Sequence, residues 1–303
     1  MSFGEVLIQQ LINGLIMGSF YALVALGYSM VYGIIKLLNF AHGDIYMVGA
    51  FSCLAVFGVI SPIVPGWGGV ILSVFAAMII AGILGYCSQR FAYRPLLGAP
   101  RLSLLITAIG VSLVVSNAVM VITGARSRFF SSGIDSSAGM QFGEVRITYI
   151  QITVIAVAAT LMVLLNLFIG RTMTGKAMRA IALDKDTCKL MGINVNRTIA
   201  QTFIIGSALA AVAGGLFCIR YSGPVNFSMG FMIGIKAFTA AVIGGIGSIP
   251  GAMLGGLLLG VLEAMGTQFL GSAWEDVFAF GILILILIIR PNGLMGRSEI
   301  ERM

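Results

Sequence analysis

Long apolar segments separated by short polar ones dominate the sequence. The first runs over residues 6–35, and further segments lie at 45–60, 70–89, 102–123, 149–169, 199–219 and 277–289. Most of them approach the length of about 20 residues with which an α-helix crosses a bilayer core of about 30 Å. Together with the hairpin described next, the pattern predicts an all-α, polytopic membrane helical bundle of about eight to nine transmembrane spans.

Residues 231–268 are expected to form a transmembrane hairpin. Two apolar arms of roughly 17 residues each flank a turn rich in glycine and proline at residues 247–251. In the second arm, Gly251 and Gly255 are spaced four apart, and so are Gly256 and Gly260. This spacing lets helix backbones approach closely inside a membrane. The hairpin is therefore predicted to pack tightly against a neighbouring helix.

Each arm of the hairpin carries one charge, Lys236 in the first arm and Glu263 in the second. The two residues are equally far from the turn, so an antiparallel hairpin places them at a similar depth. An unpaired charge at that depth costs at least ~3 kcal/mol on insertion scales. We therefore predict an intramembrane ion pair between Lys236 and Glu263.

A polar interruption at residues 36–44 separates the first two apolar segments and contains Asn39, His42 and Asp44. It is compatible with a broken helix whose polar groups line a translocation path. It is equally compatible with a cytoplasmic turn in which Asn39 and Asp44 cap helix ends. A metal site is not expected, because His42 is the only histidine and no other ligand lies at metal-binding spacing.

Composition narrows the class of protein. Hydrophobic residues make up 59% of the 303 residues and charged residues 10%, which excludes an ordinary soluble domain. The apolar segments leave no room for one, so residues 1–303 are expected to form a single transmembrane domain. The net charge of +7 comes from basic residues gathered in a few loops, as membrane orientation requires, and a nucleic-acid partner is not expected.

The distribution of basic residues predicts the orientation. Loops 90–101, 171–197 and the tail 290–302 are rich in lysine and arginine and are placed in the cytoplasm by the positive-inside rule. The loop at 271–276 has acids and no base, and it is placed outside. The loop at 125–148 carries three arginines, but the number of spans before it places it outside as well.

The cytoplasmic loop 171–197 is predicted to contain a short helix. Asp184 is a suitable N-cap, the helix would end at Met191, and Gly192 suits the position after it. Such a helix would present apolar and basic side chains to a partner; they are Leu183, Lys185, Cys188, Lys189, Leu190 and Met191. The alternative is a solvated loop that only fixes topology.

Nothing in the sequence predicts an enzyme. Residues 170–176 match the GxxxxGK pattern of phosphate-binding loops, but Ala177 follows where Ser or Thr would bind Mg²⁺. A membrane helix, and not a β-strand, is expected before the match. We therefore expect no nucleotide site and no cofactor in this chain.

Four segments resemble the permeases of branched-chain amino acid ABC importers, a family that also includes permeases for ribose and urea-type substrates. They are GYSMVYG at 27–33, NFAHGD at 39–44, MGIN at 191–194 and KAFTAAVIGGIGSIPGA at 236–252. The resemblance covers essentially the whole chain and is to the smaller of the two paired permeases. It implies a multi-pass protein of the bacterial inner membrane that imports leucine, isoleucine or valine.

The same resemblance implies partners. They are a second permease subunit, two cytoplasmic ATP-binding subunits that hold ATP and Mg²⁺, and a periplasmic or lipid-anchored substrate-binding protein, with membrane lipid around the bundle. It also implies that residues 182–193, from Ala182 through Gly192 to Ile193, form the coupling helix that docks on an ATPase. Thr187 and Cys188 depart from the small residues common there. From the residues alone, a secondary transporter or a channel for a small polar solute, such as urea or another amino acid, remains an alternative.

Overall fold

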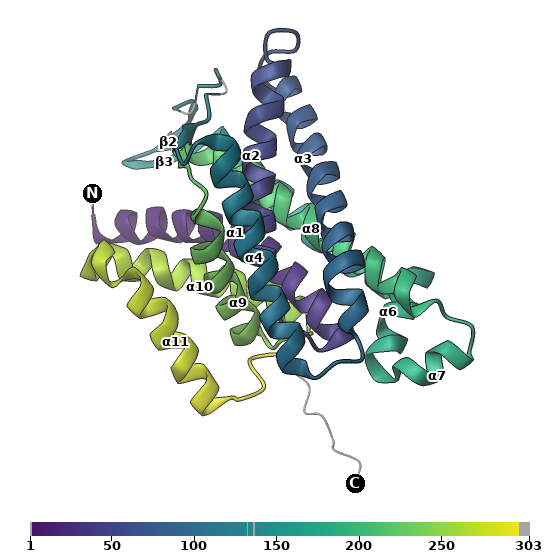
Figure 1. Cartoon of the computed structure of the whole chain (residues 1–303). Helices are drawn as coiled ribbons and strands as arrows, with labels where there is room; N and C mark the ends of the chain where they lie inside the picture. Colours follow the sequence, from purple (N-terminus) through teal and green to yellow (C-terminus); the bar gives the residue numbers. More distant parts are fainter. Residues whose placement is uncertain (1, 132, 136, 297–303) are drawn as a thin grey trace.

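The computed structural model describes residues 2–131, 133–135 and 137–296. Helices account for most of this part of the chain (Figure 1). The helices are α1 (Phe3–Ile35), α2 (His42–Ile60), α3 (Trp67–Cys87), α4 (Arg101–Thr123), α5 (Tyr149–Arg171), α6 (Met173–Leu183), α7 (Lys185–Leu190), α8 (Val195–Tyr221), α9 (Met229–Gly244), α10 (Ile249–Leu270) and α11 (Glu275–Ile289).

Short elements complete the fold. They are the π-helical turn η1 (Ser88–Tyr93), the 3-10 turns η2 (Arg94–Leu96) and η3 (Ser272–Trp274), and the strands β1 (Arg128–Phe129), β2 (Gly139–Phe142), β3 (Val145–Thr148) and β4 (Pro224–Val225). The strands form two antiparallel pairs, β1 with β4 and β2 with β3.

The prediction of a polytopic helical bundle is confirmed. In the described part of the chain, eight helical segments are long and apolar enough to cross a membrane, and α9, with 16 residues, is a ninth, shorter apolar helix. The first segment is one unbroken helix of 33 residues. The hairpin predicted at 231–268 corresponds to α9 and α10, which are joined through Gly245 and Gly247, both with positive φ.

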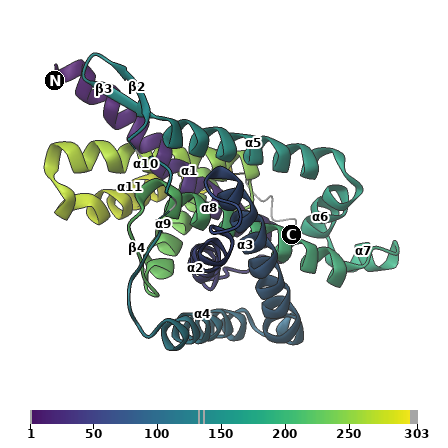
Figure 2. The same ribbon diagram turned by 90° about the horizontal axis from the view of Figure 1, so that it is seen from above.

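Glycines bring α10 close to two neighbours at once. A side chain on Gly255 would collide with the backbone of Ala240 and Gly244 on α9. One on Gly256 would meet the backbone of Ala22 on α1, and Gly260 faces Gly14 and Gly18 of α1 in the same way. The first glycine pair of α10 therefore packs against α9 and the second against α1. Helix α1 lies along α10 (Figures 1 and 2).

A second group of helices packs through small residues on α8. Gly49 of α2 lies against Ala211, and Gly85 of α3 lies against Ser207. In contrast, α4 and α11 bury only 6% of their most apolar windows, and α4 lies at the edge of the bundle (Figure 2). Each of these two helices therefore has one face against the bundle and a wide face that is open to lipid or to another subunit.

Contacts group the loops at two ends of the bundle. At one end, β1 pairs with β4, which joins the loops after α4 and α8. The N-terminal part of α1 reaches the same end as the last turn of α10, because Gln10 Nε2 donates to Gln268 Oε1 at 2.5 Å. The N–H of Arg146 in loop 125–148 donates to Gln9 Oε1 at 3.0 Å, so the two sets of contacts lie at one end. This agrees with the grouping expected for loops 125–148 and 271–276, and it adds the N-terminal part of α1 to their side.

The opposite end holds the other set of loops. Gly33 near the end of α1 lies against Gly247 in the turn between α9 and α10. The segment after α11 reaches the same turn, because the N–H of Leu294 donates to the carbonyl of Ile243 at 2.9 Å. The tail from 297 to 302 lies outside the described residues. Which end faces the cytoplasm remains a prediction from the positive-inside rule.

Candidate functional site

The polar interruption at 36–44 connects α1 to α2, and its three candidate path residues are buried. Asn39, His42 and Asp44 are each only 2% exposed. The hydroxyl of Tyr93 donates to Asn39 Oδ1 at 2.6 Å, and the hydroxyl of Ser112, in the middle of α4, donates to Asp44 Oδ2. Irregular backbone of this kind is tolerated in a membrane where protein or a water-filled path surrounds it.

The capping interpretation of this segment is wrong for both side chains. The N-cap of α2 is Ala41, which provides no side-chain hydrogen bond. Asn39 and Asp44 instead bind Tyr93 and Ser112 on other helices. Residues 36–41 connect α1 to α2, and each of these helices is long and apolar enough to cross a membrane by itself. The segment is therefore a turn between two spans, and its role in a translocation path stays a prediction.

Packing contacts position the side chain of His42. Its imidazole occupies the space beside Gly27 on α1 and approaches Gly206 on α8. The ring of Tyr28 packs edge-on against it, with ring centroids 5.0 Å apart. Its Nε2 has no hydrogen-bond partner, and the same is true of Asn39 Nδ2. Unpaired buried polar atoms cost about 1–3 kcal/mol each, so these two atoms are candidates for contact with a transported solute or water.

A cluster of four charges lies where α9, α10 and α11 meet. Lys236 Nζ lies 2.5 Å from Glu263 Oε1, so the two residues of the expected pair are in contact. It also lies 2.5 Å from Glu275 Oε1 and 3.0 Å from Asp276 Oδ1. The two further acids begin α11, and sequence reasoning missed them because it assigned both residues to an outer loop. One lysine therefore holds three helices together.

Helix α6 packs against the bundle through Met178 and Ile181, and together with α7 it forms an arm at the edge of the bundle (Figures 1 and 2). Thr172 caps α6, and its hydroxyl accepts from the N–H of Gly175. Asp184 caps α7 as expected, and its carboxylate accepts from the N–H groups of Asp186 and Thr187. These hydrogen bonds and the one from the Thr187 hydroxyl lower the pKa of Asp184. The short helix thus begins and ends within a residue of the predicted bounds.

The exposed side chains of the arm differ in part from the predicted set. Leu183, Leu190 and Met191 are 90%, 88% and 78% exposed. Cys188 was expected among them, but it is only 6% exposed and packs inward. Lys189 is not a free cation on a basic stripe, since its Nζ lies 2.7 Å from Asp186 Oδ1. The exposed apolar surface is therefore smaller than predicted, because it lacks Cys188. The charge of Lys189 is also partly offset by Asp186.

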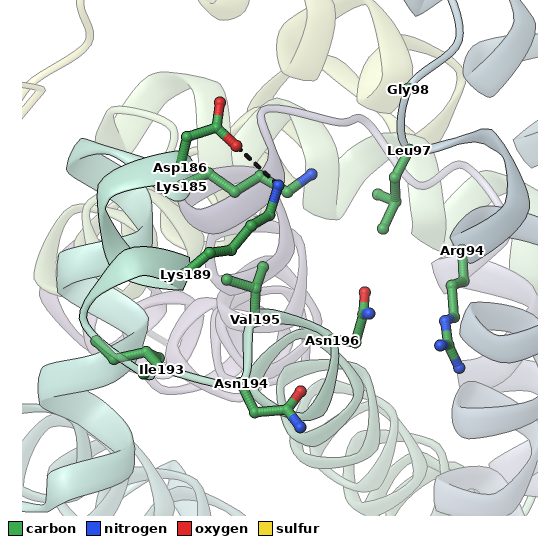
Figure 3. Close-up of a pocket in the computed structure, with 11 residues that line it drawn as sticks. Arg94, Leu97, Gly98, Lys185, Asp186, Lys189, Ile193, Asn194, Val195 and Asn196 are labelled. Atoms are coloured by element: carbon green, nitrogen blue, oxygen red, sulfur yellow. Dashed lines mark hydrogen bonds and ion pairs between the residues drawn. The ribbon is translucent and has the colours of Figure 1, made fainter.

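A cleft of about 780 Å³ opens beside the arm (Figure 3). Lys185 and Lys189 of α7 border it on one side, and Leu97 and Arg94 border it on the other. Asn194 and Asn196, at the beginning of α8, form its floor. Among the described residues, no group of three or more His, Cys, Asp and Glu side chains has an arrangement that could hold a metal ion.

These features define a polytopic α-helical membrane protein with buried polar residues where α1 meets α2 and an arm that projects from one end. The chain belongs to the family described as the branched-chain amino acid transport system / permease component, whose model matches residues 10–287.

Relatives from two bacteria align over almost the whole chain. The high-affinity branched-chain amino acid transport system permease protein BraD of Pseudomonas aeruginosa is 49% identical, with 97% of each chain aligned. The permease protein LivH of the corresponding Escherichia coli system is 43% identical, also with 97% of each chain aligned. LivM, another E. coli permease protein with the same description, is 29% identical over 44% of this chain and 34% of its own.

Proposed function

We propose that this protein is a membrane-spanning permease subunit of an ATP-driven importer for branched-chain amino acids in a bacterial inner membrane. The identity of 49% and 43% to named permease proteins over 97% of the chain supports the substrate class. In this proposal the chain forms part of the translocation path and binds no ATP itself. Hydrolysis belongs to separate subunits.

The observation that carries the coupling role is the exposed apolar tip of the arm. Leu183, Leu190 and Met191 gain nothing from exposure to water, whereas a groove in an ATP-binding subunit would bury them. Each buried side chain contributes about 1–2 kcal/mol. The tip of the arm, from Ala182 to Gly192, is therefore proposed as the coupling element. Asp184, Lys185 and Lys189 would make polar contacts, and Cys188 would hold the tip through its buried side chain.

The complete transporter is proposed to contain a second permease subunit, two ATP-binding subunits and a separate substrate-binding protein. Two E. coli permease proteins share one description but differ in their similarity to this chain, which supports pairing with a different permease. The apolar, outward-facing α4 and α11 are candidate surfaces for that subunit. The buried residues Asn39, His42 and Asp44 are the candidate path, because two of their polar atoms have no hydrogen-bond partner.

The test replaces Leu190 and Met191 by Asp in the complete transporter, reconstituted with its ATP-binding subunits. We expect loss of uptake and of the ATP hydrolysis that loaded binding protein stimulates, with membrane insertion unchanged. Met140→Asp is the matched control, since Met140 is a 48% exposed methionine at the other end of the bundle. Full stimulation in the double variant would exclude the arm as the coupling element.

A secondary transporter is the second candidate, because Asp44 and Glu263 are buried acids of the kind that carry protons or ions. Asp44 accepts a hydrogen bond from Ser112, and Glu263 forms an ion pair with Lys236. Uptake into vesicles that contain the chain without ATP-binding subunits separates the two functions. Uptake that follows an ion gradient there would favour the second candidate.

A further inference from the structure

A second cleft, of about 320 Å³, lies between the end of α3 and the beginning of α8. It adjoins the cleft beside the arm and shares Arg94, Asn194 and Asn196 with it, and Figure 3 shows these three residues around the common edge. The remaining lining residues are Tyr86, Gln89, Arg90, Arg197 and Ala200.

This second cleft is strongly basic. Arg90, Arg94 and Arg197 line it, and no acidic residue does so in the described part of the chain. None of the three arginines forms an ion pair with a carboxylate among the described residues. A guanidinium group binds phosphate oxygens through two parallel hydrogen bonds. Three such groups around one cleft favour a phosphate ligand.

A buried amide gives an independent indication of a ligand. Gln89 lines the cleft and is 2% exposed, yet its Nε2 has no hydrogen-bond partner. Gln89 and Arg90 both belong to the π-helical turn η1, a local widening that is common at functional sites. The first turn of α8 also begins at this cleft, and although Asn194 Oδ1 accepts from the N–H of Arg197 there, the helix dipole favours an anion.

The surroundings indicate a lipid as the source of the phosphate. On the helical stretch that carries Gln89 and Arg90, Ile83 is 58% and Phe91 76% exposed, and Tyr86 at the cleft is 43% exposed. Apolar side chains beside a tyrosine and arginines are typical of a helix at the membrane–water interface. Basic pockets between transmembrane helices on the cytoplasmic side bind anionic headgroups.

We propose that the cleft formed by Gln89, Arg90, Arg94 and Arg197 binds the phosphate headgroup of an anionic phospholipid of the cytoplasmic leaflet. The acyl chains would lie along the exposed apolar face of α3. The bound headgroup would bridge α3 and α8 next to the arm. This site requires the predicted orientation of the bundle but does not depend on the transported substrate.

The experiment compares lipid binding to the full chain in detergent by native mass spectrometry, with phosphatidylglycerol and phosphatidylcholine as probes. We expect phosphatidylglycerol to be retained at least about tenfold more strongly, as anionic recognition by several arginines requires. The variant Arg90→Gln/Arg197→Gln should lose this preference. The control Arg171→Gln/Lys176→Gln removes the same charge from exposed residues outside the cleft and should keep it.

Gln89→Leu provides a second variant, because it removes the unpaired amide without changing the charge. It should weaken phosphatidylglycerol retention while the chain remains folded by size-exclusion chromatography. Equal loss of the preference in the control pair would overturn the proposal, since the effect would then be one of net charge. Binding of inorganic phosphate that needs Arg90 and Arg197, in a parent chain that does not prefer phosphatidylglycerol over phosphatidylcholine, would assign the cleft to free phosphate and overturn the lipid source. Unchanged lipid retention with loss of copurifying subunits would assign it to a protein interface.

Discussion

The imidazole of His42 occupies the space that a side chain on Gly27 would need. The two residues belong to α2 and α1, and a methyl group on Gly27 would collide with Nε2 of the imidazole. Gly206 of α8 lies against Gly27, with the position of an added Cβ 3.3 Å from Gly27 Cα and 3.6 Å from His42 Cε1. The imidazole of His42 therefore fills space that two glycines on neighbouring helices leave free.

Gly27→Ala should therefore disturb the packing of His42 on α1. We expect a loss of about 1–3 kcal/mol in stability from overpacking, measured by thermal unfolding in detergent. His42→Ala in the same chain should relieve the collision, so the double variant should be more stable than the sum of the single effects predicts. Gly110→Ala is the control, because nothing lies within 4 Å of a Cβ there. Strict additivity would show that the two residues do not compete for space.

The charge cluster predicts unequal effects at Lys236 and Glu263. Lys236→Met leaves three carboxylates without their shared cation and should cost about 3–5 kcal/mol, the usual effect of breaking a buried pair. Glu263→Gln should cost less, because Glu275 and Asp276 still pair with the lysine. The folded fraction on size-exclusion chromatography after heating measures both. A Lys236→Met variant as stable as the parent would contradict the three-helix role of the lysine.

The glycine contacts of α10 predict a second packing effect. Gly256→Ala places a methyl group against the backbone of Ala22 on α1, and backbone cannot move aside as a side chain can. A loss of about 1–3 kcal/mol or more is expected, whereas Gly281→Ala on α11 meets nothing within 4 Å and should be neutral or slightly stabilising. Thermal unfolding of the two variants gives the comparison. Equal stability would exclude close packing of α1 on α10.

The cap of α7 predicts a pH dependence of the arm. The Thr187 hydroxyl and the N–H groups of Thr187 and Asp186 bind the Asp184 carboxylate and lower its pKa. Because the folded pKa is the lower one, the stabilisation is present above the ordinary value of about 3.9 and is lost as pH falls through the lowered pKa. Hydrogen exchange of residues 185–190 should show this loss. Asp184→Asn should remove the pH dependence and keep the cap.

Cysteine labelling tests the assignment of the two ends. In a chain without its four native cysteines, Gln141→Cys should react in intact cells with a membrane-impermeant thiol reagent. Lys176→Cys should react only after the membrane is opened. Both side chains are exposed and flank the same span, α5. Labelling of Lys176→Cys in intact cells would reverse the orientation, and with it the side to which the arm projects.

The spans, the hairpin and the cap at Asp184 were predictable from the sequence. They depend on local properties, namely the length of an apolar run, a glycine and proline turn, and a capping residue followed by a helix. The depth of Lys236 and Glu263 was predictable for a similar reason, because it requires only counting from the turn. Close approach at the glycines of α10 was also indicated, since Gly spacing is read along one helix.

The contacts between neighbouring helices depend on the tertiary structure and could not be predicted from the sequence. In a membrane, lipid is as apolar as the bundle interior, so hydrophobicity does not distinguish the buried face of a span from its exposed face. The sequence therefore could not show that Gly255 meets α9 while Gly256 meets α1. It also could not show that Tyr93 binds Asn39, since a hydrogen bond between residues 54 apart depends on how whole helices pack.

The same reasoning explains errors in the predicted sites, of which Cys188 and the acids Glu275 and Asp276 are examples. Cys188 was assigned to the docking surface from its position on a short helix, but the orientation of that helix against α6 and α8 turned it inward. Glu275 and Asp276 were assigned to a loop, whereas the start of α11 places both beside Lys236. Local sequence determined which segments span the membrane, and only the packing of those segments determined which polar groups meet, because lipid and protein interior are equally apolar surroundings for a helix.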